Sequence, residues 1–461
     1  MIDSEKFVIV FLAVIRVRAT AAPLNPIFTQ EEFEFYLFDS ESKLLLTNKK
    51  GNDAAEAAAG KLGILRATVD FSDPSFDVFI DLLSASGCCG KASVDRVFND
   101  ASDVALFLHT SGTTSRPKGV PLTQHNLAAS VRNIRMAYRL NETDSTLVVL
   151  PLFHVHGLIA GLLSSFSAGA AVALPASSRF SASNFWAEMR AAGATWYTAV
   201  PTIHQILLDR HAAAPEQDYP KLRFIRSCSA WLPPAVLAGL EAVFGAPVLE
   251  SYAMTEAAHL IASNPLPEDG LRKPGSVGMP VGQHMAILDE DGAVQPPGTA
   301  GEVCIRGPNV VKGYKNNPEA NVAAFLFGWF HTGDVGCMDD DGYIHLVGRI
   351  KELINRGGEK ISPIEVDAVL LSHPAVAQAV AFGVPDKKYG EEINCAIILR
   401  KGAVIDVEEV ARHCRKNLAP FKVPKRIFVA ESLPKTATGK IKRQMVAELF
   451  VLPAEESKAA A

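Results

Sequence analysis

The chain has 461 residues, of which 48% are hydrophobic and 21% are charged, so most of it is expected to fold. It carries 45 lysines and arginines against 50 aspartates and glutamates, a formal net charge of -5 at pH 7. This balance gives no electrostatic reason to expect a nucleic acid or an anionic membrane surface as the main partner. The length predicts about three domain-sized units.

The cysteines and the first apolar run both favour an intracellular protein. Seven cysteines are scattered without a paired CxxC motif, which argues against a disulfide framework or a structural zinc site. The run Phe7–Ile15 is shorter than the roughly 20 residues of a membrane-spanning helix and has no small-residue cleavage site before Arg16. A buried strand or helix is predicted there. The C-terminal SKAAA is not a peroxisomal address, so a cytoplasmic location is expected.

Between residues 104 and 250, short apolar runs rich in β-branched residues alternate with longer helical patterns. This alternation predicts parallel sheets covered by helices. The expected strands are Val104–Leu108, Thr146–Leu150, Ala171–Leu174, Trp196–Val200, Phe224–Ser227 and Val248–Glu250, and the expected helices are Leu127–Tyr138, Ser183–Ala192, Thr202–His211 and Ala235–Phe244.

The pattern changes twice further along the chain. After Gly270, glycine and proline punctuate short strands, which predicts a small β subdomain. After Arg349 the pattern is that of a compact α+β unit. The predicted fold is α/β: a large N-terminal domain of parallel sheets covered by helices plus the β subdomain (residues 1–349), then a smaller, mobile α+β domain (350–452) and a tail (453–461).

The most informative segment is Thr110–Gly119, TSGTTSRPKG, directly after a predicted strand. Its hydroxyls and backbone N–H groups can donate to phosphate oxygens, glycine lets the backbone approach an anion, and Lys118 adds positive charge. It is not a Walker A loop, because Lys118 follows Pro117 and precedes Gly119. A phosphate-binding loop is predicted; the alternative is a surface loop rich in Ser, Thr and Gly.

TSGTTSRPKG resembles the phosphate loop of the adenylate-forming superfamily, which includes acyl-CoA synthetases, luciferases and adenylation domains of peptide synthetases. Two positions depart from the family pattern: Ser115 and Ala253 each stand where the family usually has glycine. Further motifs follow in the family's order, namely PLFHVHG at 151–157, ESYAMTE at 250–256, HTGD at 331–334, GRIKELI at 348–354 and PKTATGKIKR at 434–443.

The resemblance implies an acid–thiol ligase that works in two halves. A carboxylate attacks the α-phosphate of ATP to give an acyl-adenylate and pyrophosphate, and a thiol, usually that of coenzyme A, then displaces AMP. The first half brings an anion onto a polyanion, so it needs positive charge and a metal. The implied small molecules are a carboxylate, ATP, Mg²⁺ and CoA, with no nucleic-acid partner and no membrane span.

The resemblance also assigns roles to single residues. Glu256 is expected to hold Mg²⁺, and Lys351 to be the hinge between the domains. Asp334 is expected to accept hydrogen bonds from the ribose. Without the other motifs, the Thr255–Glu256 pair would indicate a helix N-terminus, and Arg349 and Lys440 would indicate solvated charges. The expected catalytic residues are Lys440, Thr255, Glu256 and Arg349, and the expected ATP-binding residues are Thr110, Ser111, Gly112, Thr113, Thr114, Ser115, Lys118, Glu250, Ser251, Tyr252, Thr255, Asp334, Arg349 and Lys440.

The acyl pocket of the family is lined by segments that here supply His154, Ser229, Trp231 and His259, with His204 nearby. Two histidines and a serine are costly to bury without a polar partner, and a second carboxylate on a short acid would be one. Partly protonated imidazoles could pair with that carboxylate. The alternative is that His154 and His259 are structural.

The segments SCSAWLPP and MTEAAHLIASNPL resemble the plant and fungal oxalate–CoA ligase branch most. Oxalate or another small dicarboxylate is therefore predicted, bound by His154, Ser229, His259 and Lys440.

Three other activities stay open. The acid could instead be coumarate-like or a fatty acid, or the adenylate could be transferred to a carrier protein. The third possibility is a catalytically impaired nucleotide-binding paralogue. Resembling enzymes carry further residues before the segment that matches Phe7–Pro26, so a less stable first subdomain is expected. The oligomeric state is not predicted.

Overall fold

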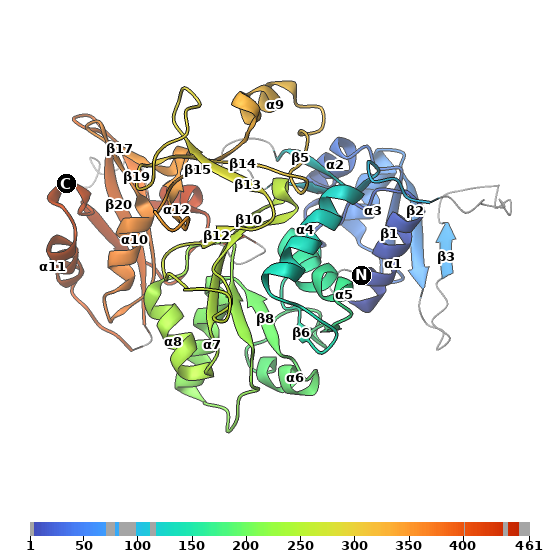
Figure 1. Cartoon of the computed structure of the whole chain (residues 1–461), viewed down its shortest axis with the longest axis horizontal. Helices are drawn as coiled ribbons and strands as arrows, with labels where there is room; N and C mark the ends of the chain where they lie inside the picture. Colours follow the sequence, from blue (N-terminus) through green and yellow to red (C-terminus); the bar gives the residue numbers. More distant parts are fainter. Residues whose placement is uncertain are drawn as a thin grey trace, which may run out of the picture.

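The molecule is an α/β assembly in which the first and last parts of the chain lie at opposite ends, with a large sheet and its helices between them (Figure 1). The predicted α/β class is confirmed. Among the residues described, no helix is both long and apolar enough to cross a bilayer. The computed structural model describes residues 4–70, 79–82, 98–110, 117–400, 402–436 and 441–450.

The first apolar run forms helix α1 (Glu5–Arg16), which begins after Ser4, whose side chain accepts a hydrogen bond from the backbone N–H of Phe7. Phe7, Val8 and Phe11 are buried in the main core, which settles the expectation of a buried strand or helix in favour of the helix. Next come α2 (Gln30–Asp39), α3 (Asp53–Lys61) and a three-stranded sheet of β1 (Leu44–Asn48), β2 (Leu65–Asp70) and β3 (Phe79–Leu82).

The largest sheet in the described part of the chain has the strand order β12-β11-β10-β9-β8-β6-β7. From β7 to β10 neighbouring strands are parallel, as the alternating pattern predicts, and Phe224–Ser227 has the bounds expected from the sequence. The antiparallel extension through β11 and β12 was not predicted. The strands are β6 (Ser145–Leu147), β7 (Ala171–Ala173), β8 (Trp196–Ala199), β9 (Phe224–Ser227), β10 (Val248–Met254), β11 (His259–Ser263) and β12 (Met279–Pro280).

Helices cover this sheet, with α7 and α8 on one side of the strands and α4 and α5 on the other (Figure 1). A π-helix, η1, continues directly into α5; a π-helix was not predicted. The helices are α4 (Gln124–Ala137), η1 (His156–Leu163), α5 (Ser164–Ser167), α6 (Phe185–Ala191), α7 (Pro201–Ala213) and α8 (Pro234–Phe244).

Two antiparallel units lie beside the large sheet. One is the hairpin of β4 and β5, and the other is the predicted β subdomain, a four-stranded sheet of order β13-β14-β15-β16. Their elements are β4 (Val104–His109), β5 (Gly119–Thr123), β13 (His284–Leu288), β14 (Gly301–Arg306), β15 (Phe330–Met338) and β16 (Ile344–Arg349), with α9 (Pro318–Ala324) and the 3₁₀ turns η2 (Thr255–Ala257) and η3 (Leu326–Gly328) between them.

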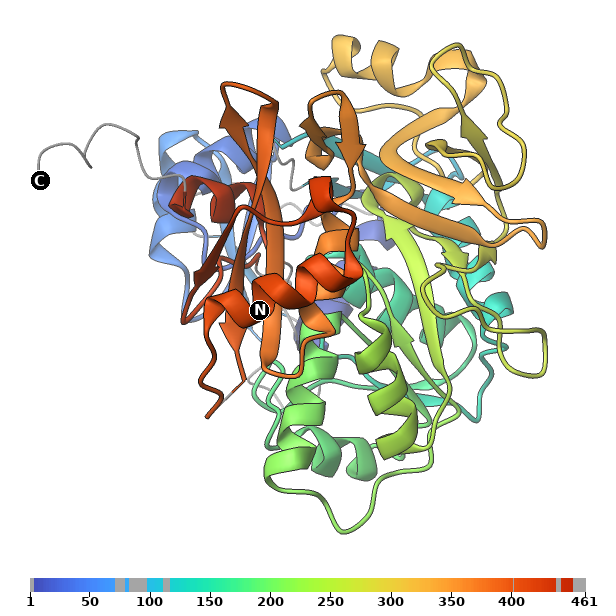
Figure 2. The same cartoon turned by 90° about the vertical axis from the view of Figure 1, so that its left-hand side faces the viewer.

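The last part of the chain forms its own sheet (Figure 2). It also has its own apolar core, which includes Ile354, Val366 and Ile397. Its strands and helices form the compact α+β unit expected after Arg349. The elements are η4 (Ile350–Glu352), β17 (Ile354–Arg356), β18 (Glu359–Ile361), α10 (Pro363–Leu371), β19 (Val376–Asp386), β20 (Gly390–Leu399), α11 (Val407–Asn417), η5 (Pro420–Lys422), β21 (Arg426–Val429) and α12 (Arg443–Phe450).

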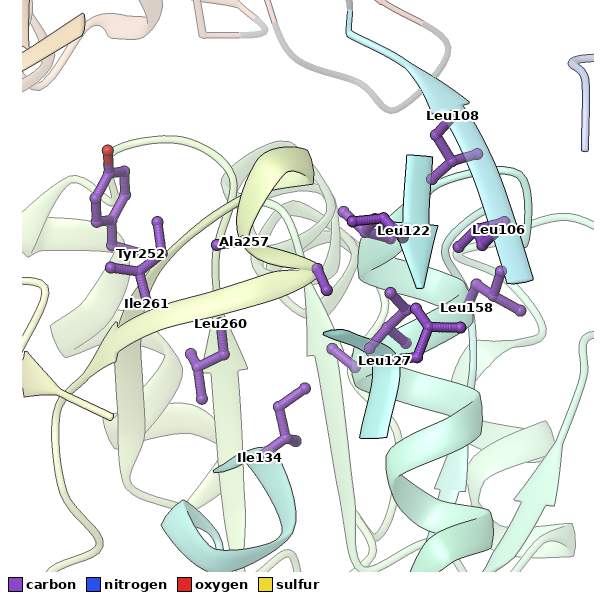
Figure 3. Packing of buried hydrophobic residues seen from close by; sticks show 14 of the residues in the cluster. Leu106, Leu108, Leu122, Leu127, Ile134, Leu158, Tyr252, Ala257, Leu260 and Ile261 are labelled. Carbon is purple, nitrogen blue, oxygen red and sulfur yellow. The ribbon is translucent and has the colours of Figure 1, made fainter. Parts of the chain in front are cut away.

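The main core joins the β4–β5 hairpin to α4 and to strand β11 (Figure 3). Leu106 of β4, Leu122 of β5 and Leu158 of η1 are fully buried, as are Ile134 of α4 and Leu260 of β11. At about 25 cal/mol per Å² of apolar surface, side chains of this size each contribute roughly 1.5–3 kcal/mol. The core therefore fixes the hairpin that carries the predicted phosphate loop against the strand that carries His259.

Arg443, at the start of α12, ties this helix to the rest of the C-terminal unit. Its Nη2 atom donates to Asp367 Oδ2 at 2.8 Å, its Nε atom lies 3.3 Å from Glu352 Oε2, and it also donates to the carbonyl of Ala381. Asp367 is buried, and its Oδ1 accepts from the N–H of Ala381. The sequence offered no sign of these contacts, because Arg443 stands in a basic segment that would be solvated on its own.

Replacement of Arg443 by Met should destabilise the C-terminal unit by about 3 kcal/mol, because a buried carboxylate loses its partner. Arg415→Met, which removes an exposed pair with Glu408, should change stability by less than about 1 kcal/mol. Hydrogen–deuterium exchange of α10 and β19 peptides measures both. Equal protection of these peptides in Arg443→Met and wild type would contradict the account.

Candidate active site

The β4–β5 hairpin fixes both ends of the predicted phosphate loop. The backbone N–H of Thr110 donates to the carbonyl of Lys118 at 3.0 Å, and the backbone N–H of Lys118 is 3.3 Å from Thr110 Oγ1. Thr110 and Lys118 are thus held together, and their expected role in binding ATP stays a prediction. The other predicted loop residues, Ser111, Gly112, Thr113, Thr114 and Ser115, lie outside the described residues, as does Lys440.

Glu256 is buried where β10 ends, with 7% of its surface exposed. Tyr314 donates a hydrogen bond to its Oε1 atom at 2.8 Å, and the Nζ atom of Lys118 lies 4.5 Å from the centre of the Tyr314 ring. Burial raises the pKa of Glu256, whereas Tyr314, Arg349 and Lys118 favour its charged form. Thr255 begins a single 3₁₀ turn without a side-chain cap, so the pair does not cap an α-helix.

Asp334 and Arg349 face each other across the β15–β16 ladder. The Nε atom of Arg349 lies 3.2 Å from Asp334 Oδ1, and the hydroxyl of Tyr252 donates to Asp334 Oδ2. Asp334 is 7% exposed, so a buried carboxylate is held by one charged and one neutral donor. The structure brings these three predicted residues together, although they come from three segments of the chain.

Glu250 and Ser251 precede Tyr252 on β10. The Oε2 atom of Glu250 accepts from the backbone N–H of Gly275 at 2.9 Å, and Ser251 Oγ donates to the carbonyl of Ser227 at 3.1 Å. Glu250 is 5% exposed, and burial raises its pKa from 4.5 to about 7. A carboxyl group in this state is half protonated near neutral pH.

The predicted acyl residues Ser229 and His259 both have strained backbone. Their φ angles are 74° and 105°, and Ala258 has a φ of 48°. Residues other than glycine rarely adopt these angles, and such strain persists only where the surrounding structure imposes it, often at functional sites. His259 is buried, and its ring centre lies 5.0 Å from that of His156.

His156, which was not predicted as a site residue, is the histidine that contacts Ser229. Its Nδ1 atom lies 3.0 Å from Ser229 Oγ, and the residue is 1% exposed. The predicted His154 is partly exposed, and its Nδ1 atom accepts from the backbone N–H of His156 at 3.2 Å. The sequence-based prediction named His154 and not His156 for the acyl site. His156 lies beside Ser229 because η1 begins at His156 and directs that ring inward, and the role of His154 stays a prediction.

Gly157 explains why η1 can begin at this point. A Cβ atom on this residue would lie 2.4 Å from the carbonyl oxygens of Leu150 and Pro151, closer than real Cβ atoms come. Only glycine allows the helix to pack directly on this backbone. The glycine of PLFHVHG therefore places His156 beside β9.

The remaining predicted residues occupy less central places. His204 is buried beside the hydroxyl of Tyr197, at 3.4 Å, and burial lowers its pKa to about 3, so it belongs to the neutral core. Trp231 is partly exposed. Lys351 lies in η4 at the entry to the C-terminal sheet, exposed to solvent.

Besides His156, three residues that contact the site were missed by sequence reasoning. Tyr314 follows a glycine in an unassigned segment, and Thr198 looks like an ordinary strand residue. Arg226 carried a usable signal: a charged residue inside the strand FIRS is rarely fully buried unless it is paired. Its exposed surface is 0%.

Among the described residues, one group of three side chains of metal-ligand type has ligand atoms within 4.8 Å of one another: Glu302, Cys304 and His331. His331 Nδ1 already lies 2.8 Å from Glu302 Oε2, and burial raises the pKa of the Cys304 thiol. Mg²⁺ prefers oxygen ligands. Glu256 is therefore the better candidate for Mg²⁺.

Sequence profiles of two families match the chain: that of AMP-binding enzymes over residues 1–315 and that of the AMP-binding enzyme C-terminal domain over residues 365–440. The chain belongs to the AMP-binding enzyme family. This confirms the predicted superfamily and, with it, the predicted class of enzyme, an AMP-forming acid–thiol ligase that uses ATP and CoA.

Curated relatives and solved structures agree with this family. A probable CoA ligase of Humulus lupulus is 69% identical over 459 residues, covering 99% of this chain and 87% of the relative. An oxalate–CoA ligase of Arabidopsis thaliana is 67% identical, covering 97% of this chain and 87% of the relative. The o-succinylbenzoate–CoA synthetase of Bacillus subtilis, solved with ATP and a magnesium ion, is 31% identical with a TM-score of 0.81, covering 96% of this chain and 87% of that one.

The raised pKa of Glu250 predicts a dependence of stability on pH. The folded state holds the proton more tightly than the unfolded chain, so this group's contribution to stability is complete below pH 4.5 and is lost as pH rises to about 7. Glu250→Gln should therefore match wild type near pH 4.5 and be more stable at pH 8 by at most about 3 kcal/mol. Urea unfolding at several pH values measures this, with exposed Glu290→Gln as the control. A Glu250→Gln curve parallel to wild type would refute it.

Proposed function

We propose that this chain is a CoA ligase for oxalate or another small dicarboxylate. The observation that carries the proposal is the buried polar set around Ser229. His156 lies against its hydroxyl, Arg226 lies behind His156, and neither ring nitrogen of His259 has a hydrogen-bond partner among the described residues. A fatty acid or coumarate would leave these groups without an acceptor, which is costly in a buried pocket. The 67% identity to the oxalate–CoA ligase of Arabidopsis thaliana supports the same acid.

The polar residues on the other side of the site suit ATP. In the first half, one carboxylate oxygen bonds to the α-phosphorus while the bond to pyrophosphate breaks. Thr255 and Arg349 would bind the α-phosphate, Lys118 and the loop from Thr110 the outer phosphates, and Asp334 the ribose hydroxyls. Each role follows from a donor or acceptor of the matching charge.

Glu256 is a suitable ligand for Mg²⁺, which prefers oxygen ligands. Burial raises the pKa of this carboxylate, and a bound cation would stabilise its charged form. Mg²⁺ would neutralise phosphate charge during the transfer. The solved Bacillus subtilis relative, which holds ATP and a magnesium ion, supports this choice.

Residues 350–452 would turn relative to residues 1–349 about Lys351 between the two halves. The separate apolar core of the C-terminal unit and the exposed position of Lys351 support such a rotation. One arrangement would bring Lys440 to the carboxylate and the α-phosphate, and the other would expose the adenylate to CoA. The cytoplasmic location stays a prediction.

A panel of acids tests the proposal. Purified protein is given ATP, Mg²⁺, CoA and one acid from oxalate, malonate, succinate, acetate, coumarate and octanoate, and AMP and the acyl-CoA are quantified. Oxalate or another short dicarboxylate should give the highest kcat/KM. Activity on coumarate or octanoate with none on a dicarboxylate would refute the proposal, and adenylate formation without CoA consumption would favour a carrier protein as acceptor.

Lys440→Ala should lower adenylate formation by about 100- to 1000-fold, because a positive charge is lost where charge develops. Thioester formation from supplied acyl-adenylate should change much less. Lys442→Ala, an exposed lysine two residues away, is the matched control and should leave both halves near wild type. Comparable loss of both halves in Lys440→Ala would show that Lys440 does not act mainly in the first.

A further inference from the structure

A chain of buried hydrogen bonds runs from the end of α4 to Ser229. Arg226 Nε donates to the hydroxyl of Tyr138 at 2.7 Å, and Arg226 Nη1 donates to Thr198 Oγ1 at 3.1 Å. His156 Nε2 lies 2.6 Å from Thr198 Oγ1 and 3.3 Å from Arg226 Nη1. His156 Nδ1 lies 3.0 Å from Ser229 Oγ. Tyr138, Thr198, Arg226 and His156 are all at most 2% exposed.

The guanidinium fixes the direction of these bonds, because it only donates. Arg226 donates to Thr198 Oγ1, so the Thr198 hydroxyl is free to donate to His156 Nε2, to which Arg226 also donates. That nitrogen must therefore be the one without a proton. Burial and the charge of Arg226 lower the pKa of His156 well below its ordinary value, so the ring is neutral. Its single proton lies on Nδ1 and is donated to Ser229.

This arrangement fixes the direction of the hydrogen bonds that Ser229 makes. Because its oxygen accepts from His156, its own hydroxyl hydrogen is free to donate elsewhere. The strained φ of 74° at Ser229 fixes the position of this hydroxyl. Two further buried groups lie beside His156, namely the side chains of Arg226 and His259. Within the described residues, Arg226 Nη2 and both ring nitrogens of His259 have no hydrogen-bond partner.

We propose that Arg226 is a positioning and specificity-determining residue. Through Thr198 it holds His156 in the tautomer with its proton on Nδ1, so that Ser229 offers its hydroxyl hydrogen to the distal carboxylate of the acid. Its buried charge makes the pocket prefer a dianionic acid over a monoanionic one. This inference rests on the proposed dicarboxylate substrate. The sequence suggested that partly protonated histidines pair with the second carboxylate. In this proposal the histidines His156 and His259 are neutral, and the positive charge is that of Arg226.

Kinetics of Arg226→Met and Arg226→Lys test the proposal. Arg226→Met should raise the KM for the preferred dicarboxylate at least about tenfold, the equivalent of one charge-assisted hydrogen bond, with a smaller change in kcat. The KM for MgATP should stay within about twofold of the wild-type value. The ratio of kcat/KM for oxalate to that for acetate should fall by about the same factor as the KM for the dicarboxylate rises. Arg226→Lys should restore part of both losses, because it keeps the charge.

Arg223→Met is the matched control. Arg223 stands three residues away and is bound to Asp144 by two hydrogen bonds of 2.7 and 2.6 Å. Its loss should lower the melting temperature without changing the KM for the acid. A folded Arg226→Met enzyme with wild-type KM and wild-type acid preference would overturn the proposal and leave Arg226 as a structural tie between α4 and the sheet.

The tautomer of His156 is a second, independent readout. In protein labelled with ¹⁵N-histidine, the signal that disappears in His156→Gln should show a protonated Nδ1 in wild type. A protonated Nε2 would overturn the proposal whatever the substrate. If Arg226→Met does not fold, Thr198→Val takes its place, and an unchanged KM for the acid in that variant would also overturn the proposal.

The two proposals fail in different ways. A wild type that is active on monocarboxylates and on no dicarboxylate would refute the proposed function together with the dianion preference. The tautomer measurement would still decide whether the hydrogen-bond chain exists.

Discussion

The charge of Arg226 cannot be removed by titration, because a guanidinium stays protonated at every pH at which the protein is folded. It also cannot reach water, since the residue is fully buried. The neighbouring elements must therefore supply acceptors, and they do so from three directions: the Tyr138 hydroxyl at the end of α4, Thr198 on β8 and the His156 ring on η1. This requirement brings α4, the sheet and the π-helix to one point and leaves a polarised group, Ser229, at the predicted acyl site.

The residues proposed to bind ATP carry buried charges of the opposite sign. There the buried charges are carboxylates, Glu256 and Asp334, and each is held by a tyrosine hydroxyl together with a basic residue nearby. The groups that are proposed to meet ATP and Mg²⁺ are thus acidic, whereas the buried charge next to the proposed acyl residues is the cation Arg226. This difference fits the proposed reaction, in which one set of residues binds a polyanion and the other a small acid.

Sequence reasoning found what depends on local pattern and missed what depends on packing. Phe224–Ser227 was placed correctly because the short run that begins with Phe224 and Ile225 lies between two helical patterns, which indicates a strand of a parallel sheet. Nothing in the sequence indicates that His156 faces Ser229, because the onset of a π-helix at this residue depends on how Gly157 packs against the backbone of Leu150 and Pro151. The role of Arg226 could not be inferred from the sequence, because its partner Thr198 lies nearly 30 residues earlier in the chain.

The central claim is that this protein joins a small dicarboxylate to AMP, and exchange of labelled pyrophosphate into ATP tests it most directly because no CoA is needed. With Mg²⁺ present, exchange should depend on added oxalate or a similar short dicarboxylate and should be absent without acid. A folded sample that supports exchange with a monocarboxylate, and with no dicarboxylate at any concentration, would contradict the account.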